Sequence, residues 1–184
     1  MRRIHSSEIE NAVYALAKEA CLGLIPSCKA ALERAADEEK GESAKFALDT
    51  LLQNAEIAKK ENMAVCQDTG YAVVLAEIGQ DVQIEGELFA DAVDAGVRSA
   101  YEDFCFRKSI CDPLTRVNTA DNTPAAIHTE LTAGDKIRLT FLPKGFGSEN
   151  MSRIYMLTPA KGTESVIDAI VETVRLAGSK PCPP

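Results

Sequence analysis

The sequence lacks the features that mark membrane proteins, secreted proteins and nucleic-acid-binding proteins. No apolar run approaches the roughly 20 residues of a membrane-spanning helix, and residues 1–5 lead into an amphipathic stretch with acids, not into a signal peptide. Lys and Arg number 20 against 28 Asp and Glu, and the net charge of -8 argues against nucleic acid or an anionic membrane as main partner. We therefore expect a cytoplasmic protein. A local cluster of Arg and Lys would still be sufficient to bind a small anionic substrate.

Close pairs of cysteines are also missing. None of the spacings is Cys-x-x-Cys, so the sequence does not indicate a zinc finger, and a zinc or redox site would have to be created by the fold. In a reducing compartment we expect thiols and not disulfides. The six cysteines are Cys21, Cys28, Cys66, Cys105, Cys111 and Cys182.

The chain is long enough for one sizeable core, and it contains no internal repeat, low-complexity tract or linker. We expect one domain over residues 1–184, with a helical subregion at 1–62 and an α/β part at 63–184. Helical and strand-like periodicities occur in separate blocks. They predict a mixed α+β fold, in which N-terminal helices pack with a largely antiparallel sheet and flanking helices.

Apolar stripes predict helices that begin near Ser7, Pro26, Ser43, Leu88 and Thr163. In the first of these helices, Ser7 and Glu10 have the spacing of a capping box. The last helix should be capped by Thr163, end at Gly178 and bury a stripe that consists of Val166, Ile167, Ile170, Val171 and Val174.

Strands are predicted at 71–78, 82–84, 125–131, 135–142 and 154–157. The third and fourth should form a hairpin around Gly134. In the fourth, Ile137, Leu139 and Phe141 alternate with polar residues, as in a half-buried antiparallel strand.

The segment Cys66-Gln67-Asp68-Thr69-Gly70 places a thiol, an amide, a carboxylate and a hydroxyl in succession before a buried strand. Two interpretations carry about equal weight. The segment is either a turn closed by Asp68 and Gly70, with Cys66 as a small buried hydrophobe, or a metal anchor whose neighbours face the bound ligand.

Three further polar loops occur at 106–124, 143–152 and 180–184. In the first, Arg107 and Arg116 could each hold a carboxylate bidentately, although each taken singly is more often a surface arginine. In the second, Lys144 precedes the glycines, unlike in a Walker A sequence, so a plain turn is favoured over a phosphate cradle. In the third, prolines flank Cys182, and this motif by itself predicts a C-terminal tail without regular structure.

Together these loops resemble the iron–sulfur hydro-lyases, namely class I fumarate hydratases and the alpha subunits of two-subunit fumarases and L-tartrate dehydratases. The matching stretches occur in the family's order over residues 66–184. They are Cys66–Gly70, Asp112–Leu114, Asn118-Thr119, Asp121–Pro124, Lys144–Asn150 and Pro181–Pro184.

The resemblance implies a [4Fe–4S] cluster that is held by three cysteines and keeps its fourth iron open for substrate. Such an iron acts as a Lewis acid, which suits the dehydration of a 2-hydroxy dicarboxylic acid. Cys66 and Cys182 resemble two of the three ligands. Of the residues around the substrate, Gln67 and Asp68 resemble contact residues, Arg107 resembles the carboxylate clamp, and Gly147 resembles a backbone part of the pocket.

The sequence departs from the family in three ways. The family's third cysteine ligand lies beyond the Pro-Cys-Pro-Pro motif, and its general base lies in a separate beta domain or subunit. Phe146 replaces a glycine, which could narrow the pocket. None of the other four cysteines lies in a matching motif.

We therefore expect the N-terminal part of an alpha subunit, inactive alone, that pairs with a beta subunit in a larger oligomer and hydrates fumarate to malate. L-tartrate is the alternative substrate. The other alternative is a non-catalytic subunit or binding module that has the same fold and no cluster.

Overall fold

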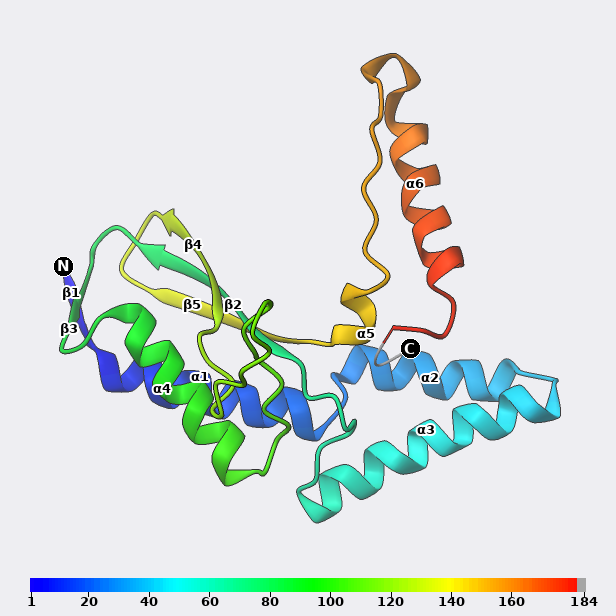
Figure 1. Ribbon diagram of the computed structural model, residues 1–184, viewed down its shortest axis with the longest axis horizontal. Helices are drawn as coiled ribbons and strands as arrows, with labels where there is room; N and C mark the ends of the chain where they lie inside the picture. Colours follow the sequence, from blue (N-terminus) through cyan, green and yellow to red (C-terminus); the bar gives the residue numbers. More distant parts are fainter. Residues whose placement is uncertain (182–184) are drawn as a thin grey trace. The chain divides into compact units, whose positions relative to one another are not determined.

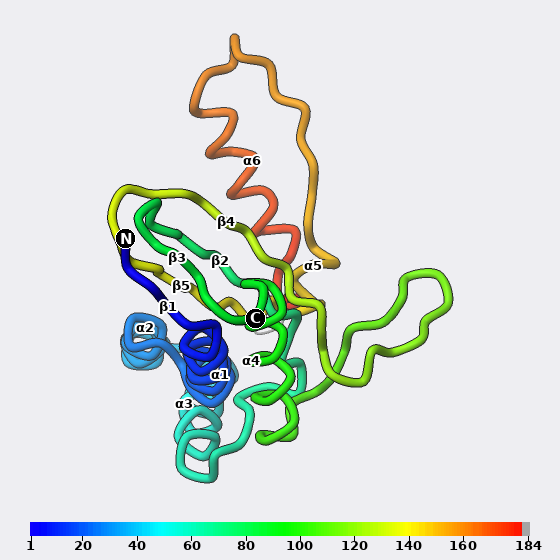
Figure 2. Tube along the Cα trace, turned by 90° about the vertical axis from the view of Figure 1, so that its left-hand side faces the viewer, coloured from blue at the N-terminus to red at the C-terminus, as the bar shows by residue number. Residues whose placement is uncertain are grey.

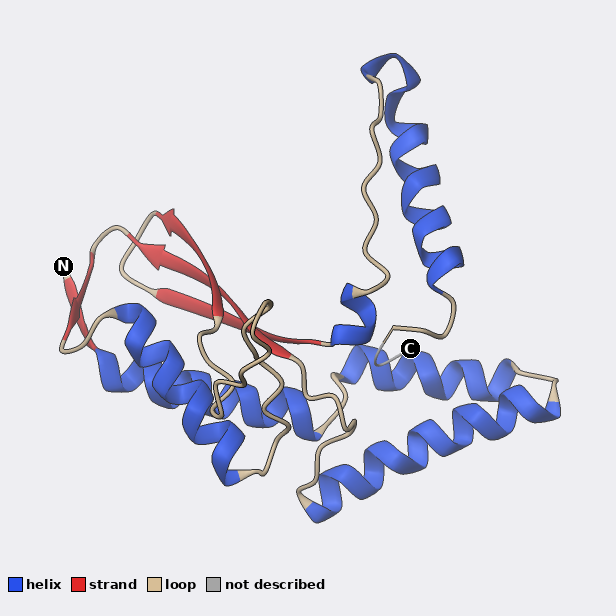
Figure 3. Cartoon of the chain, in the orientation of Figure 1, coloured by secondary structure: helices blue, strands red, loops and turns tan. Residues whose placement is uncertain are grey.

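The structure, a computed structural model, describes residues 1–181 and shows helices combined with small mixed sheets (Figures 1 and 3). This confirms the mixed α+β class. The chain divides into two compact units, Met1–Pro143 and Lys144–Pro184. The predicted single domain stays a prediction, and each unit is described by itself.

The first unit contains the four predicted helices and a short strand at the N-terminus that the sequence did not indicate. This strand, β1, is Arg2–His5, and the helices are α1 (Ser6–Leu22), α2 (Pro26–Glu38), α3 (Glu42–Glu61) and α4 (Phe89–Asp103). The capping box of α1 differs from the prediction, because His5, where β1 ends, is the N-cap. Its Nδ1 accepts from the Ser7 N–H, and its own N–H donates to Glu8 Oε1, each over 3.3 Å.

The strands form two small sheets. In the first, β1 pairs in parallel with β3 (Val82–Glu85). In the second, the order is β4-β2-β5, with β2 at Tyr71–Gly79, β4 at Ala126–Thr132 and β5 at Ile137–Lys144. Strands β2 and β4 are parallel over their whole pairing. On the other side of β2 lies β5. Gly79 N–H donates to Lys136 O, and Glu77 pairs with Arg138, so residue numbers fall along β2 as they rise along β5 and the two strands are antiparallel.

The predicted hairpin and the predicted largely antiparallel sheet are therefore wrong. Strand β2 lies between the two predicted arms, and the turn between them passes over the end of β2, where Asp81 N–H donates to Gly134 O over 2.9 Å. Gly79 permits this passage, because a Cβ at that position would overlap the Gly134 carbonyl. The alternation in β5 correctly identified Phe141 as buried. Alternation indicates which face is buried, but it does not identify the neighbouring strand.

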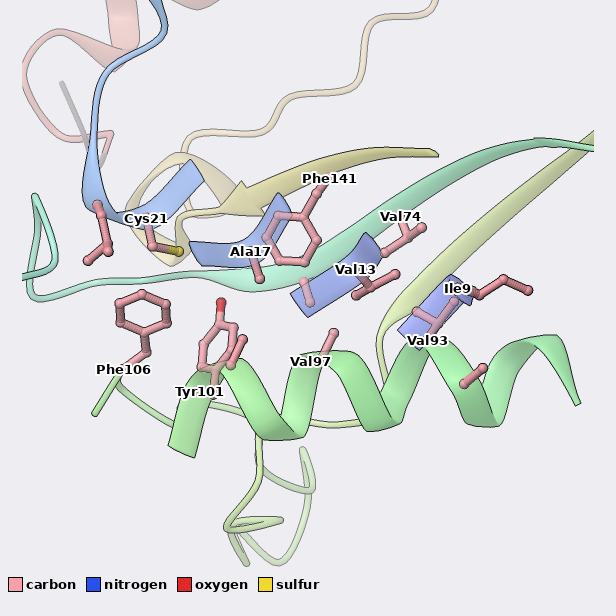
Figure 4. Close-up of a cluster of buried hydrophobic side chains, with 14 of the residues drawn as sticks. Ile9, Val13, Ala17, Cys21, Val74, Val93, Val97, Tyr101, Phe106 and Phe141 are labelled. Atoms are coloured by element: carbon pink, nitrogen blue, oxygen red, sulfur yellow. The ribbon is translucent and has the colours of Figure 1, made fainter. Parts of the chain in front are cut away.

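The core of the first unit lies between α1, α4 and the sheet (Figure 4). The apolar stripe of α1, which the sequence predicts as Ile9, Val13, Leu16, Ala17 and Ala20, faces this core. Ile9, Val13 and Ala17 are buried, and Leu16 and Ala20 are partly buried and pack against the core. The two helices approach closely at Gly96, where a Cβ would lie 2.5 Å from Glu10 O and 2.9 Å from Val13 Cβ. The side chains labelled in Figure 4 are Ile9, Val13, Ala17, Cys21, Val74, Val93, Val97, Tyr101, Phe106 and Phe141.

The second unit contains α5 (Phe146–Glu149), the 3₁₀ turn η1 (Pro159–Lys161) and α6 (Gly162–Ala177). The strand predicted at 154–157 is wrong. That segment is a loop in which Ile154 and Met156 are more than nine-tenths exposed, and no described strand pairs with it.

Helix α6 ends at Gly178 as predicted, with a φ of 54°. Its predicted cap is wrong, because the N-cap is Lys161 and not Thr163. Its predicted buried stripe is also wrong, since side chains on it are 46–67% exposed. These are Val166, Ile167, Ile170, Val171 and Val174. Within residues 1–181, no helix combines the length and the apolar character needed to cross a membrane.

Candidate functional site

The residue before Cys66 is fixed by two helices. Val65 N–H donates to Cys21 O, at the end of α1, over 2.9 Å. Asn54 Nδ2, from α3, donates to Val65 O over 2.8 Å. Cys66 therefore begins its loop from an anchored backbone.

Inside the loop, the backbone turns around the Asp68 side chain. Gly70 N–H donates to Asp68 Oδ1 over 3.0 Å, and Asp68 N–H donates to Cys66 Sγ over 3.4 Å. Cys66 Sγ also lies 3.6 Å from Gln67 Oε1. The predicted turn closed by Asp68 and Gly70 is confirmed. Cys66 itself is half-buried and lies in this polar loop, so it is not the small buried hydrophobe of the turn interpretation.

A buried polar cluster lies under the loop. Tyr101 Oη, from α4, donates to Thr69 O over 2.6 Å and lies 3.2 Å from Gly70 O. Burial raises the pKa of the Cys21 thiol to about 12, and this effect outweighs the hydrogen bond with Tyr101, which lowers the pKa. Burial, and then Cys21, raise the pKa of Tyr101. Both groups therefore stay protonated at neutral pH and serve as donors. Figure 4 shows the Tyr101 hydroxyl directed toward Cys21.

Arg107 lies on the segment next to this loop. Thr69 Oγ1 donates to Arg107 O over 3.2 Å, while the Arg107 side chain is exposed. Asn122 joins the same two segments, because its Oδ1 accepts from Ser109 N–H over 2.9 Å and its Nδ2 donates to Gly70 O over 3.2 Å. The structure thus places Cys66, Gln67, Asp68 and Arg107 on two segments that are hydrogen-bonded to each other.

The loop after Arg107 is extended but internally ordered (Figure 2). Asp112 Oδ1 accepts from the Thr115 and Leu114 N–H groups over 2.6 and 2.9 Å, and these hydrogen bonds lower the pKa of Asp112. Arg116, the second candidate carboxylate clamp, lies exposed in this turn with a φ of 62°.

The end of this loop is fixed to α4. Arg98 Nε donates to Asp121 Oδ2 over 3.0 Å, and Ala125 N–H donates to Asp94 Oδ1 over 2.8 Å. Partial burial alone would raise the pKa of Asp121, but hydrogen bonds from Thr123 and Arg98 outweigh it and lower the pKa to about 2.

Gly147 lies in α5 of the second unit, so the predicted polar loop there is a helical turn. Lys144 Nζ donates to Ser148 Oγ over 2.9 Å and pairs with Glu149 over 3.1 Å, and Ser148 Oγ donates to Gly145 O over 2.7 Å. The sequence favours a plain turn over a phosphate cradle for this loop, and the structure has a single turn of α-helix there instead. The pocket role of Gly147 stays a prediction. The predicted ligand Cys182 lies outside the described residues.

Sequence reasoning did not single out the two buried side chains that hold the site, Tyr101 and Asn122. Tyr101 had no signal beyond its place on the apolar stripe of a helix. Asn122 lies in the Asp-Asn-Thr-Pro stretch that carried the family resemblance, but that stretch does not indicate its partners.

A metal ion would need more ligands than this part of the chain brings together. Residues 1–181 contain no group of three or more His, Cys, Asp or Glu side chains that could hold one. Within the described residues, Cys66 therefore stays a single candidate ligand and is not part of a complete metal site.

Comparisons with known proteins identify relatives over nearly the whole chain. Residues 10–184 match the family described as fumarate hydratase (Fumerase). A candidate L(+)-tartrate dehydratase alpha subunit of Methanocaldococcus jannaschii is 34% identical over an alignment of 183 positions, which covers 96% of this chain and 64% of that protein. The aerobic class I fumarate hydratase of Escherichia coli K12 is 35% identical over an alignment of 152 positions, which covers 80% of this chain and 28% of that protein. An L(+)-tartrate dehydratase alpha subunit of E. coli UTI89 is 26% identical over an alignment of 157 positions, which covers 83% of this chain and 52% of that protein. The chain thus spans less than two thirds of the length of each of these relatives.

Proposed function

Because the chain belongs to the fumarate hydratase (Fumerase) family, we propose that it is the N-terminal part of the alpha component of an iron–sulfur hydro-lyase. In this proposal the complete enzyme converts fumarate reversibly into malate. The observation that carries the proposal is the hydrogen bond from Thr69 Oγ1 to Arg107 O, which holds Asp68 and Arg107 on neighbouring segments.

Each of these side chains has a role that its surroundings permit. The exposed Arg107 guanidinium can bind a carboxylate of the substrate bidentately. The hydrogen bond from Gly70 N–H orients the Asp68 carboxylate, and Gln67 beside it offers an amide to the substrate. For Gly147, the family resemblance alone supports a role as a backbone contact of the substrate. A beta subunit would supply the general base.

In the proposed cluster site, Cys66 is one of three cysteine ligands. The Asp68 N–H group already donates to its sulfur, and hydrogen bonds to sulfur tune iron–sulfur clusters. Cys182 would be the second ligand, and a segment outside this chain would provide the third. When bound, a [4Fe–4S] cluster with an open iron supplies a Lewis acid for the hydroxyl and carboxylate of the substrate. We therefore expect no hydratase activity from this chain alone.

Two alternatives stand beside this proposal. Two of the relatives are named as L(+)-tartrate dehydratase alpha subunits, which makes L-tartrate the second candidate substrate. The other alternative is a non-catalytic subunit or binding module of the same fold. Both it and the leading proposal expect no three-ligand group within residues 1–181, so the iron content of the assembled complex decides between them.

The test is to co-express the chain, extended by the family's remaining alpha segment, with a beta subunit, and then to reconstitute the complex anaerobically with iron and sulfide. We expect bound iron, the brown absorbance of a cluster, and fumarate hydration that exceeds L-tartrate dehydration. Faster turnover of L-tartrate would select the alternative substrate. A complex with neither iron nor activity would support the non-catalytic alternative, and full activity of the 184-residue chain alone would contradict the proposed incompleteness.

Matched variants separate the proposed roles. Cys66→Ser should remove the cluster absorbance, whereas Cys105→Ser, at an exposed thiol, should keep it. Arg107→Ala should raise KM for fumarate by about 100-fold, the effect of losing a charge-assisted bidentate contact. Arg116→Ala should leave KM unchanged, because Arg116 lies in the turn closed by Asp112.

A further inference from the structure

Asn122, whose neighbours in the chain are attached to helix α4, contacts both segments of the candidate site. The backbone around Asn122 is attached to this helix on either side, through Arg98 with Asp121 and through Asp94 with the Ala125 N–H group. Asn122 is 0% exposed and has a φ of 62°, a conformation that Asn adopts more readily than most residues. Its side chain therefore starts from a fixed position.

The two ends of the Asn122 amide contact different segments. The carbonyl oxygen accepts from Ser109 N–H, two residues after Arg107. The amide nitrogen donates to Gly70 O, two residues after Asp68. A planar amide cannot change the separation of its oxygen and nitrogen, so these two bonds, together with the bond from Thr69 Oγ1 to Arg107 O, set the distance between the segments that carry Asp68 and Arg107.

We propose that Asn122 is a positioning residue that sets the separation of Asp68 and Arg107, and with it the fit of a small dicarboxylate between them. This inference rests on the proposed function for its substrate, but its geometry does not. A neighbouring residue provides a natural comparison. Tyr101, on α4, is also buried, and its hydroxyl contacts Thr69 O and Gly70 O of the Cys66 loop. It contacts the Arg107 segment through its ring, which packs on Phe106 and is kept in Tyr101→Phe, and not through a hydrogen bond of its hydroxyl.

The first measurement is amide hydrogen exchange on the chain without substrate. Asp68 and Gly70 report on the Cys66 loop, Ser109 reports on the Arg107 segment, and Val13 reports on global opening. Relative to Val13, Asn122→Ala should speed exchange at all three site amides by about tenfold or more, since it leaves buried groups of both segments without partners. Tyr101→Phe should speed exchange at Asp68 and Gly70 and leave Ser109 unchanged.

A second variant distinguishes a local effect of the substitution from a general loss of folding. Asn122→Asp keeps the acceptor for Ser109 N–H and tolerates the positive φ, but as a carboxylate it cannot donate to Gly70 O. Exchange at Gly70 and Asp68 should therefore rise while Ser109 stays protected. Equal increases at all amides, Val13 included, would overturn the proposal, as would an Asn122→Ala effect confined to Ser109.

The second measurement uses the assembled alpha–beta enzyme. Asn122→Ala should raise KM for fumarate by about tenfold with a smaller change in kcat, because a shift of the carboxylate clamp weakens substrate binding before it affects the reacting atoms. An unchanged KM would overturn the positioning role. An inactive parent enzyme would count against the proposed function alone, and amide exchange would then decide whether Asn122 couples the two segments.

Discussion

Helices α4 and α6 have similar amphipathic sequences but differ in burial. On α4, Val93 and Val97 are 0% exposed because α1 packs across them. On α6, Ile170 and Val174 are 59% and 67% exposed, and η1 packs against this helix within the second unit. An apolar stripe thus shows which face of a helix requires a partner. Whether the partner is present depends on the rest of the chain.

The polar faces of the two helices differ in the same way. Arg98 and Asp94 on α4 bind residues that are 23 and 31 positions away in the sequence. On α6, Arg175 pairs with Glu172 three positions away on the same helix. Helix α4 therefore organises distant parts of the chain, including the loops of the candidate site.

The largest effect should come from filling the contact between α4 and α1. Gly96→Val should lower the free energy of unfolding by about 4 kcal/mol or prevent folding, because the new side chain would overlap Glu10 O and Val13. Urea unfolding followed by circular dichroism measures this. Gly23→Val is the control, since no atom lies within 4 Å of a Cβ there and the backbone is extended. Equal losses for the two variants would show that α1 and α4 are not in close contact.

A smaller difference should separate two valines, one on each helix. Val97→Ala should cost about 2 kcal/mol, from lost burial and a cavity. Val174→Ala should change stability by less than about 0.5 kcal/mol, since its side chain is mostly exposed and Ala favours a helix. The same unfolding experiment compares both. A cost at Val174 equal to that at Val97 would mean that the stripe of α6 is packed within this chain.

Local pattern predicted the elements of the fold better than it predicted their neighbours. The stripe of α1 and the alternation of β5 depend on nearby residues, and both identified the buried face. The insertion of β2 between β4 and β5 depends on a close approach at Gly79, which no periodicity records. Val174 is 67% exposed although it lies on an apolar stripe, because a stripe records which face of a helix is apolar and not what packs against it.

The same limit applies to the candidate site. Cys66 and Asp68 stand out because a thiol, an amide, a carboxylate and a hydroxyl follow one another directly before a buried strand, and Arg107 was selected by family resemblance. Asn122 is hydrogen-bonded to Ser109, 13 positions away in the sequence, and to Gly70, 52 positions away, and no local rule indicates such contacts. Sequence therefore named candidate residues, while the structure showed what holds them.

The smallest effect concerns the polar face of α4 and depends on pH. The pKa of Asp121 is lowered from 3.8 to about 2, so its ionised form stabilises the fold. This stabilisation is complete above about pH 4 and is lost as the pH falls toward 2. Because the carboxyl is partly exposed, solvent reduces the effect, and Asp121→Asn should cost about 1 kcal/mol at pH 7.

Unfolding free energies measured from pH 7 down to pH 2 test this dependence. The difference between the parent chain and Asp121→Asn should shrink through the acid range, since protonation removes the same charge in the parent. Glu172→Gln, which breaks the exposed pair on α6, should shift stability by less than about 0.5 kcal/mol. A larger loss at Glu172 than at Asp121 would reverse the comparison, because the polar face of α6 would then stabilise the chain more than that of α4.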